Sequence, residues 1–127
     1  MKAWLSSILI ILVIGAGFMV FNTSSDIQEI STEELEAKME ADKEAVYIDV
    51  REMDEFAAGH IEGMTNMPLS AFANEYTELP KDKEIVLICR SGNRSMQAAT
   101  FLQEQGYKNI TNVSGGMLAW GGPVITN

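Results

Sequence analysis

The sequence predicts an α/β domain with a mainly parallel sheet of about five short strands and helices on both of its faces. Short apolar runs alternate along the chain with stretches that have helical spacing. The run Ile85–Ile88 is apolar throughout and mostly β-branched, as expected of a strand that is buried on both faces. The 127 residues, of which 46% are hydrophobic, are enough for one domain with a core and too few for two.

Local signals indicate where these elements begin and end. Ser31 and Glu34 have the spacing of a capping box, which predicts the start of a helix. Gly59 is expected to end another helix as a left-handed cap, and Pro68 to stop a brief strand. The expected strands are 27–30, 45–50, 65–67, 85–88 and 110–113. The expected helices are 31–40, 52–58, 69–76, one that follows the Cys89 loop and ends at Gly106, and a short final helix after 114–116.

Cys89, the only cysteine, is placed between the end of a strand and the start of a helix. There the unpaired N–H groups of the first helical turn and the helix dipole favour an anion, which lowers the pKa of a thiol. A buried structural cysteine is the alternative, since free cysteine is among the most buried residue types. Two nearby arginines, Arg90 and Arg94, and Gly92, which permits tight curvature, favour an activated nucleophile instead.

The segment Cys-Arg-Ser-Gly-Asn-Arg-Ser resembles the active-site loop of single-domain rhodaneses, the thiosulfate-type sulfurtransferases. Other segments between about Ile27 and Val124 resemble the further motifs of that family in the same order. They are Ile48-Asp49-Val50-Arg51-Glu52, Glu55-Phe56, Gly59-His60-Ile61-Glu62-Gly63, Asn66-Met67-Pro68 and Val113-Ser114-Gly115-Gly116-Met117-Leu118-Ala119-Trp120. The resemblance implies a rhodanese-like domain over residues 27–127 with Cys89 as its catalytic nucleophile. The loop residues that it implies for anion binding are Arg90, Ser91, Gly92, Asn93, Arg94 and Ser95.

This resemblance implies a sulfurtransferase reaction. The Cys89 thiolate would attack the sulfane sulfur of a donor such as thiosulfate, become a persulfide, and pass the sulfur to a thiophilic acceptor. Because the chain has no second cysteine to resolve the persulfide, a small thiol, cyanide or another protein must accept the sulfur. Arg90 and Arg94 would attract the anionic donor and stabilise the departing sulfite.

Two functions other than sulfur transfer are alternatives for a loop of this kind. Rhodanese-like phosphatases and arsenate reductases have a loop one residue longer, with arginine six positions after the cysteine. Here Arg94 is five positions after Cys89 and position 95 is serine, which disfavours that chemistry. The other alternative is a persulfide or redox sensor, or a sulfur carrier module at the membrane, which uses the same exposed thiolate without turnover.

The remaining polar candidates are expected to support the site rather than to react. In the resembling family the residues that match Asp49 and Arg51 mostly hold neighbouring loops by hydrogen bonds. His60 is the only histidine, and it matches a position that is usually structural. One cysteine and one histidine cannot make a zinc site, so we expect no metal and no cofactor.

Charge restricts the partners of the domain. All 18 acidic residues and all but one of the nine basic residues lie beyond residue 21, so the domain is strongly acidic. We therefore expect no binding to nucleic acid or to anionic lipid headgroups. The three arginines, Arg51, Arg90 and Arg94, all lie in the family-like motifs. This suggests a local positive pocket, as a small anionic substrate requires.

Residues 1–21 form a separate apolar segment ahead of the domain. The 19 residues from Ala3 to Phe21 are uncharged, which is about the length that spans a bilayer. We expect a transmembrane anchor, followed by a polar linker over residues 22–26. A cleaved signal peptide with its small-residue site at Gly15-Ala16-Gly17 is the main alternative, and a buried core helix is a third.

The basic residues near this segment predict its orientation. Lys2 precedes it, and no lysine or arginine follows before Lys38. By the positive-inside rule the amino terminus stays inside and the domain lies outside. The sequence thus predicts a single-pass protein of the cell membrane with an extracytoplasmic domain, or an exported protein if the segment is cleaved.

Overall fold

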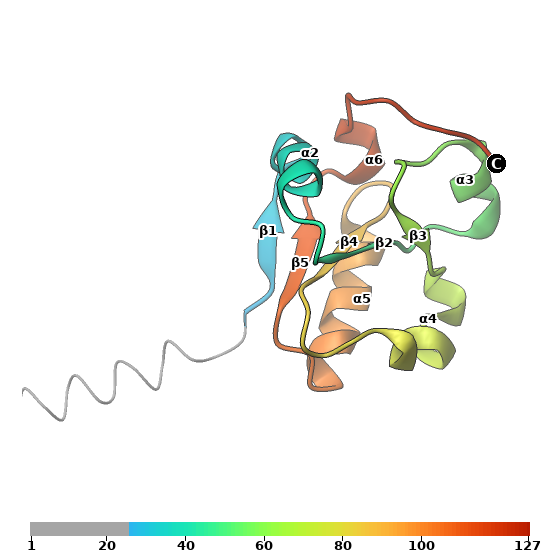
Figure 1. Ribbon diagram of the computed structural model, residues 1–127. Helices are drawn as coiled ribbons and strands as arrows, with labels where there is room; N and C mark the ends of the chain where they lie inside the picture. The colour runs from blue at the N-terminus through green and yellow to red at the C-terminus, as the bar shows by residue number, and fades with distance from the viewer. Residues whose placement is uncertain (1–25) are drawn as a thin grey trace, which may run out of the picture.

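The computed structural model describes residues 26–127, and its elements follow the predicted order (Figure 1). The strands are β1 (Gln28–Ile30), β2 (Val46–Asp49), β3 (Thr65–Asn66), β4 (Ile85–Ile88) and β5 (Ile110–Val113). The helices are α2 (Thr32–Ala41), α3 (Met53–Ala58), α4 (Leu69–Glu75), the 3₁₀ helix η1 (Tyr76–Glu78), α5 (Asn93–Glu104) and α6 (Gly116–Ala119). Every predicted strand and helix of the domain is confirmed, with ends that differ by no more than two residues.

The strands form one parallel sheet in the order β1-β5-β4-β2-β3. β4 lies at the centre, between β5 and β2, and all four of its residues are buried. This position explains why its sequence is a continuous apolar run rather than an alternating one. Because all strands are parallel, their carboxyl ends lie at one edge of the sheet, where such folds bind their ligands.

Two apolar clusters cover the two faces of the sheet, as alternate residues of β4 show. Ile85 and Leu87 pack on one face with residues of α4 and α5. Val86 and Ile88 pack on the other face with residues of α2 and α3, and with the partly buried Met117 of α6. Figure 1 shows the sheet between these two sets of helices. The prediction of helices on both faces is therefore confirmed.

The predicted caps are right in one case and wrong in the other. At the start of α2 the Glu34 amide donates to Ser31 Oγ at 3.1 Å and the Ser31 amide donates to Glu34 Oε1 at 3.0 Å, which confirms the capping box. Gly59 ends α3 but is extended, with φ 164°, and not left-handed. Its carbonyl accepts a hydrogen bond from Arg51 Nη2 at 2.8 Å, and the next residue, His60, pairs with Ile125. These tertiary contacts decide the conformation of Gly59.

The predicted membrane segment, residues 1–21, lies outside the described residues, as does the linker apart from Asp26. Within residues 26–127, no helix is long and apolar enough to cross a bilayer.

Candidate active site

Cys89 lies directly after β4, at the carboxyl edge of the sheet, and a short loop connects it to α5. Gly92 is the residue that caps α5, and its φ of 102° is in the left-handed region. A side chain at this position would be strained, so glycine allows the loop to turn back toward the cysteine. The strand, loop and helix thus have the order that the sequence predicts.

The Cys89 side chain is buried and is surrounded by hydrogen-bond donors. Its Sγ accepts the amide N–H of Gly92 at 3.1 Å and the hydroxyl of Ser95 at 3.3 Å. Burial alone would raise the pKa of the thiol. Hydrogen bonds from the Ser95 hydroxyl and from the amides of Ser95, Gly92 and Ser91 outweigh that effect, so the pKa of Cys89 lies below its ordinary value. The hydrogen bonds of the loop therefore stabilise a negatively charged sulfur at Cys89.

Helix α6 holds the same loop from the other side. The amides of Met117 and Leu118 donate to the carbonyls of Cys89 and Arg90 at 2.8 and 2.9 Å. This approach is possible because residue 116 is glycine. A Cβ at Gly116 would lie 2.4 Å from the Cys89 carbonyl oxygen, much closer than such atoms approach. The path of the backbone through Cys89 thus depends on a contact with a distant part of the chain.

The two arginines of the loop have different surroundings. Arg94 forms a bidentate ion pair with Glu55 of α3, with N–O distances of 2.6 and 2.8 Å. The Arg94 guanidinium is the main cause that lowers the pKa of Glu55 to about 2, and Glu55 in turn raises the pKa of Arg94. Arg90 is exposed and forms no ion pair with any residue from 26 to 127. The sequence interpretation has both arginines attract an anionic donor. In the structure Glu55 engages Arg94, whereas Arg90 remains unpaired within residues 26–127.

Asp49 and Arg51 lie next to this loop and contact each other, not Cys89. Arg51 donates to both carboxylate oxygens of Asp49, with Nη2 2.8 Å from Oδ2. The same guanidinium donates to the carbonyls of Gly59 and Glu55. The buried pair thus connects the end of β2 to the first turn of α3 and to Gly59 at its end.

His60 is likewise engaged away from the thiol. Its ring stacks on Phe56, with the centroids 3.7 Å apart, and its Nδ1 lies 2.7 Å from the Phe56 carbonyl oxygen. Because a carbonyl only accepts, Nδ1 carries the proton. Within residues 26–127, no three side chains of the types that bind metal ions are grouped for coordination.

Three groups at the site have no assigned role in the sequence interpretation: the Glu55 carboxylate, Gly116, and Asn112. Asn112 of β5 donates to the Gly92 carbonyl at 3.4 Å. Glu55 follows Arg51 by four positions, and Gly115 and Gly116 lie at the start of α6, but neither pattern alone identifies a contact with the loop. The contacts that these three groups make at the site are evident only from the folded structure.

Parallel strands, helices on both faces and a donor-lined cysteine at the carboxyl edge of the sheet define the class of α/β domain to which this structure belongs. Residues 31–122 match the model of the rhodanese-like domain, so the chain belongs to the rhodanese-like domain family.

Relatives and solved structures agree with this assignment. The chain is 48% identical over 97 residues to the putative sulfurtransferase YtwF of Bacillus subtilis, covering 76% of this chain and 93% of the relative. It is 35% identical to a sulfurtransferase of Allochromatium vinosum, covering 74% and 88%. The crystal structure of a rhodanese-like domain protein from Staphylococcus aureus superposes with a TM-score of 0.74 at 28% identity, covering 80% and 99%.

Proposed function

We propose that the protein is a sulfurtransferase of the rhodanese type in which Cys89 carries the sulfur. The observation that supports this most is the set of donors around Sγ, namely the Gly92 amide and the Ser95 hydroxyl. Donors in this arrangement stabilise a thiolate, and they would equally stabilise a persulfide anion. The names of the relatives, which include two sulfurtransferases, support the same class of reaction.

In the proposed reaction the Cys89 thiolate attacks the outer sulfur of thiosulfate. A sulfur–sulfur bond forms to Cys89 while the sulfur–sulfur bond of thiosulfate breaks, and sulfite leaves with the bonding electron pair. A thiophilic acceptor, either a thiolate or cyanide, then takes the outer sulfur and regenerates the Cys89 thiolate. The buried position of Cys89 favours a donor with a small terminal sulfur. Exposed Arg90, which has no ion-pair partner in the described domain, is the side chain best suited to attract the anion.

Intact-mass measurement of the protein before and after thiosulfate tests this proposal. We expect a gain of one sulfur atom that a dithiol removes, together with steady turnover when cyanide is the acceptor. Cys89→Ser should abolish both and leave the far-ultraviolet circular dichroism unchanged. Near-normal turnover in the folded variant would refute the role of Cys89. A stable persulfide without turnover would favour the sensor or sulfur carrier alternative.

We further propose that residues 1–21 anchor the domain to the cell membrane, with the domain on the outer side. The 19 uncharged residues and the single leading Lys2 support this. Full-length protein should stay in the membrane fraction after alkali, and protease added to intact spheroplasts should digest the domain. A soluble exported form that lacks the segment would indicate a cleaved signal, and full-length protein protected from protease would indicate the opposite orientation.

A further inference from the structure

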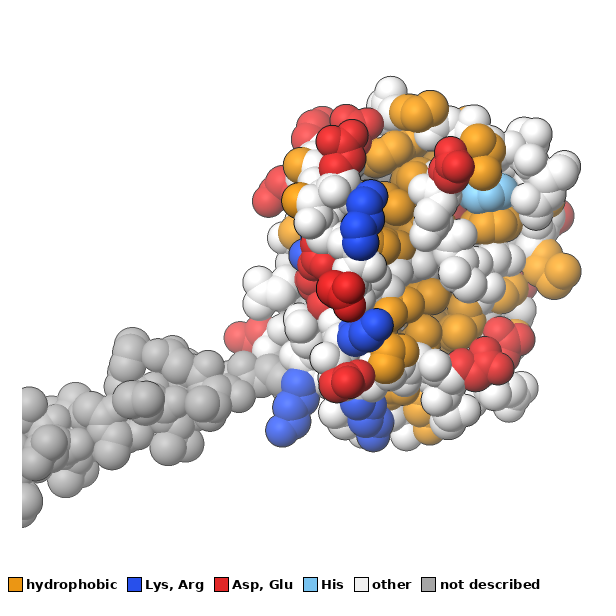
Figure 2. Space-filling view, in the orientation of Figure 1, with side chains coloured by type: hydrophobic (Ala, Val, Ile, Leu, Met, Phe, Trp, Pro, Cys, Tyr) orange, Lys and Arg blue, Asp and Glu red, His pale blue; other side chains and the backbone are white. Residues whose placement is uncertain are grey.

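A groove of about 730 Å³ lies between α2, the beginning of β2, β3 and the C-terminal segment. We call it the α2 groove. None of the residues that line it belongs to the Cys89 loop. Apolar side chains line much of it, among them Met39, Tyr47, Ile61, Trp120 and Ile125. Figure 2 shows exposed apolar side chains on this side of the domain, with both acidic and basic side chains along their border.

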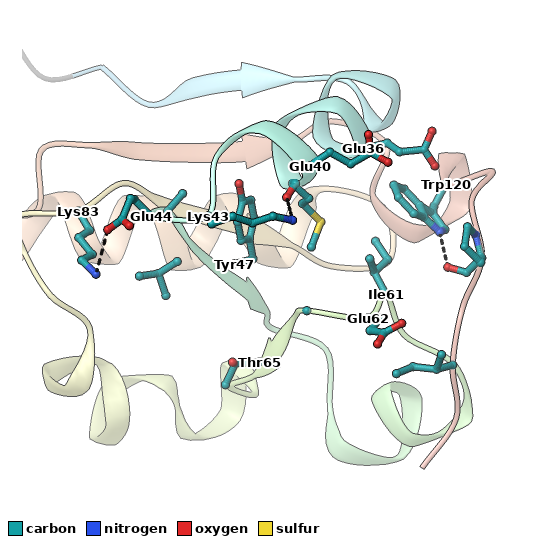
Figure 3. Close-up of a pocket in the computed structure, with 16 residues that line it drawn as sticks. Glu36, Glu40, Lys43, Glu44, Tyr47, Ile61, Glu62, Thr65, Lys83 and Trp120 are labelled. Atoms are coloured by element: carbon teal, nitrogen blue, oxygen red, sulfur yellow. Dashed lines mark hydrogen bonds and ion pairs between the residues drawn. The ribbon is translucent and has the colours of Figure 1, made fainter.

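The charged side chains around the α2 groove are mainly acidic. Glu36 and Glu40 of α2 lie along one side, and Glu62 lies beside Ile61 across from them (Figure 3). None of these three carboxylates has an ion-pair partner in the part of the chain that the structure describes. The groove therefore combines an apolar surface with carboxylates that remain available.

The two lysines of the groove are already engaged. Lys43 Nζ donates to the Met39 carbonyl at 2.7 Å, and Lys83 Nζ lies 3.8 Å from Glu44 Oε2. Because that carbonyl is neutral, Lys43 keeps its positive charge. The lining as a whole contains four glutamates and two lysines, so it carries a net charge of −2. Nucleic acid and anionic lipid would be repelled from such a surface, and so would a second copy of this chain, which has a net charge of −9.

We propose that the α2 groove binds an extended, positively charged segment of a partner protein that also carries apolar side chains. Charge complementarity with the three free carboxylates supports a cationic partner. Spacing supports an extended one. Glu36 and Glu40 are one helical turn apart, about 6 Å along the axis. Side chains on one face of an extended peptide repeat about every 6.6–7 Å, so alternate lysines or arginines can reach successive carboxylates.

Trp120 makes occupancy of the groove measurable. It is half-buried, and its Nε1 donates to the Pro123 carbonyl at 3.2 Å, so its ring lines the groove without closing it. It also directly follows α6, the helix whose amides hold the Cys89 loop. That helix has only four residues, about 6 Å in length. A segment bound against Trp120 would therefore lie close to the active-site loop.

The test uses the full-length chain with Trp4→Phe, so that Trp120 is the only tryptophan. The probe is a synthetic peptide, blocked at both ends, of sequence Lys-Leu-Lys-Val-Lys-Leu, and the control peptide has glutamate in place of each lysine. Two triple variants remove the same charge at different places. The groove variant carries Glu36→Gln, Glu40→Gln and Glu62→Gln, and the remote variant carries Glu78→Gln, Asp82→Asn and Glu104→Gln.

We expect the lysine peptide to shift Trp120 emission to shorter wavelength and the glutamate peptide to have no effect. The groove variant should bind the lysine peptide at least about tenfold more weakly, while the remote variant binds nearly as the parent does. Equal weakening in both variants would show non-specific attraction to an acidic protein and would overturn the proposal. So would an absence of binding, or a concentration-dependent dimer in sedimentation that the groove variant abolishes.

Discussion

Two carboxylate–arginine pairs lie beside the Cys89 loop, and they differ mainly in burial. In the Asp49–Arg51 pair the side chains are 0% and 8% exposed. In the Glu55–Arg94 pair both side chains are 30% exposed. In both pairs the carboxylate also accepts a backbone amide. The first pair donates in addition to two backbone carbonyls, whereas the second joins the side chains of two helices. The same residue types therefore serve different purposes on the two sides of one loop.

Burial determines what each pair contributes. Removing one partner from a buried pair leaves a charge without solvent, whereas removing one partner from a half-exposed pair leaves a charge that water can solvate. The buried pair should thus govern stability. The half-exposed pair, which includes Arg94 at the start of α5, should govern the electrostatic potential at the thiolate and its donor.

The largest effect is expected for Arg51→Ala, which leaves the Asp49 carboxylate buried without its guanidinium. Loss of one partner of a buried ion pair costs about 3–5 kcal/mol of unfolding free energy, which urea denaturation would measure. Arg90→Ala is the control, because Arg90 is exposed and unpaired within the described domain and should change stability by less than about 0.5 kcal/mol. Similar losses in both variants would mean that burial does not distinguish the arginines.

The Glu55–Arg94 pair should have its main effect on donor use. Arg94→Ala leaves the Glu55 carboxylate uncompensated near the anionic donor, and we expect kcat/KM for thiosulfate to fall. The fall corresponds to a loss of about 1.5–3 kcal/mol of transition-state stabilisation. Adding Glu55→Gln to this variant should restore part of the loss, since it removes the unpaired charge. Lys108→Ala, beyond the end of α5, is the control and should have little effect. An equal loss in Lys108→Ala would indicate that overall charge governs donor binding.

The same pair predicts a pH-dependent contribution to stability. The pKa of Glu55 is lowered in the folded protein from 4.5 to about 2. The resulting stabilisation is present above pH 4.5 and is lost as the pH falls toward about 2, where Glu55 becomes protonated in the folded state too. Because the pair is partly solvated, Glu55→Gln should cost only about 1–2 kcal/mol at neutral pH.

Unfolding of the parent and of Glu55→Gln should be compared at several pH values. The difference in unfolding free energy should shrink as the pH is lowered from about 4.5 to about 2. A difference that is independent of pH would mean that Glu55 stabilises the protein through packing and not through its charge.

Sequence alone predicted the features of this domain that depend on local patterns. The apolar run of β4 and the capping box of Ser31 and Glu34 each involve neighbouring residues, and both are confirmed. Cys89 was likewise placed between a strand and a helix by the residues around it. Contacts between distant residues were not predicted. Glu55 and Arg94 are 39 positions apart, so no local pattern reveals their ion pair.

Tertiary contacts also explain the one local prediction that was wrong and one requirement that was missed. The backbone of Gly59 is extended because its carbonyl accepts a hydrogen bond from Arg51, although glycine at a helix end commonly adopts the left-handed conformation. Gly116 is required by the close approach of α6 to the Cys89 carbonyl. From the sequence, it is indistinguishable from any glycine in a turn.

The smallest effect is expected for Ser95→Ala, which removes the longer of the two contacts to Cys89 Sγ, the hydroxyl at 3.3 Å. This hydroxyl has one proton and also lies 3.2 Å from the Gly92 carbonyl, so it donates to the sulfur only part of the time. Its loss should raise the pKa of Cys89, because burial then opposes ionisation with fewer hydrogen bonds to outweigh it. The rate of alkylation by iodoacetamide, measured against pH, should therefore rise at higher pH than in the parent. Ser91→Ala is the matched control, since the Ser91 hydroxyl makes no contact with the sulfur and only its amide acts on the thiol. Identical pH profiles for the parent and Ser95→Ala would assign the stabilisation of the thiolate to the backbone amides alone.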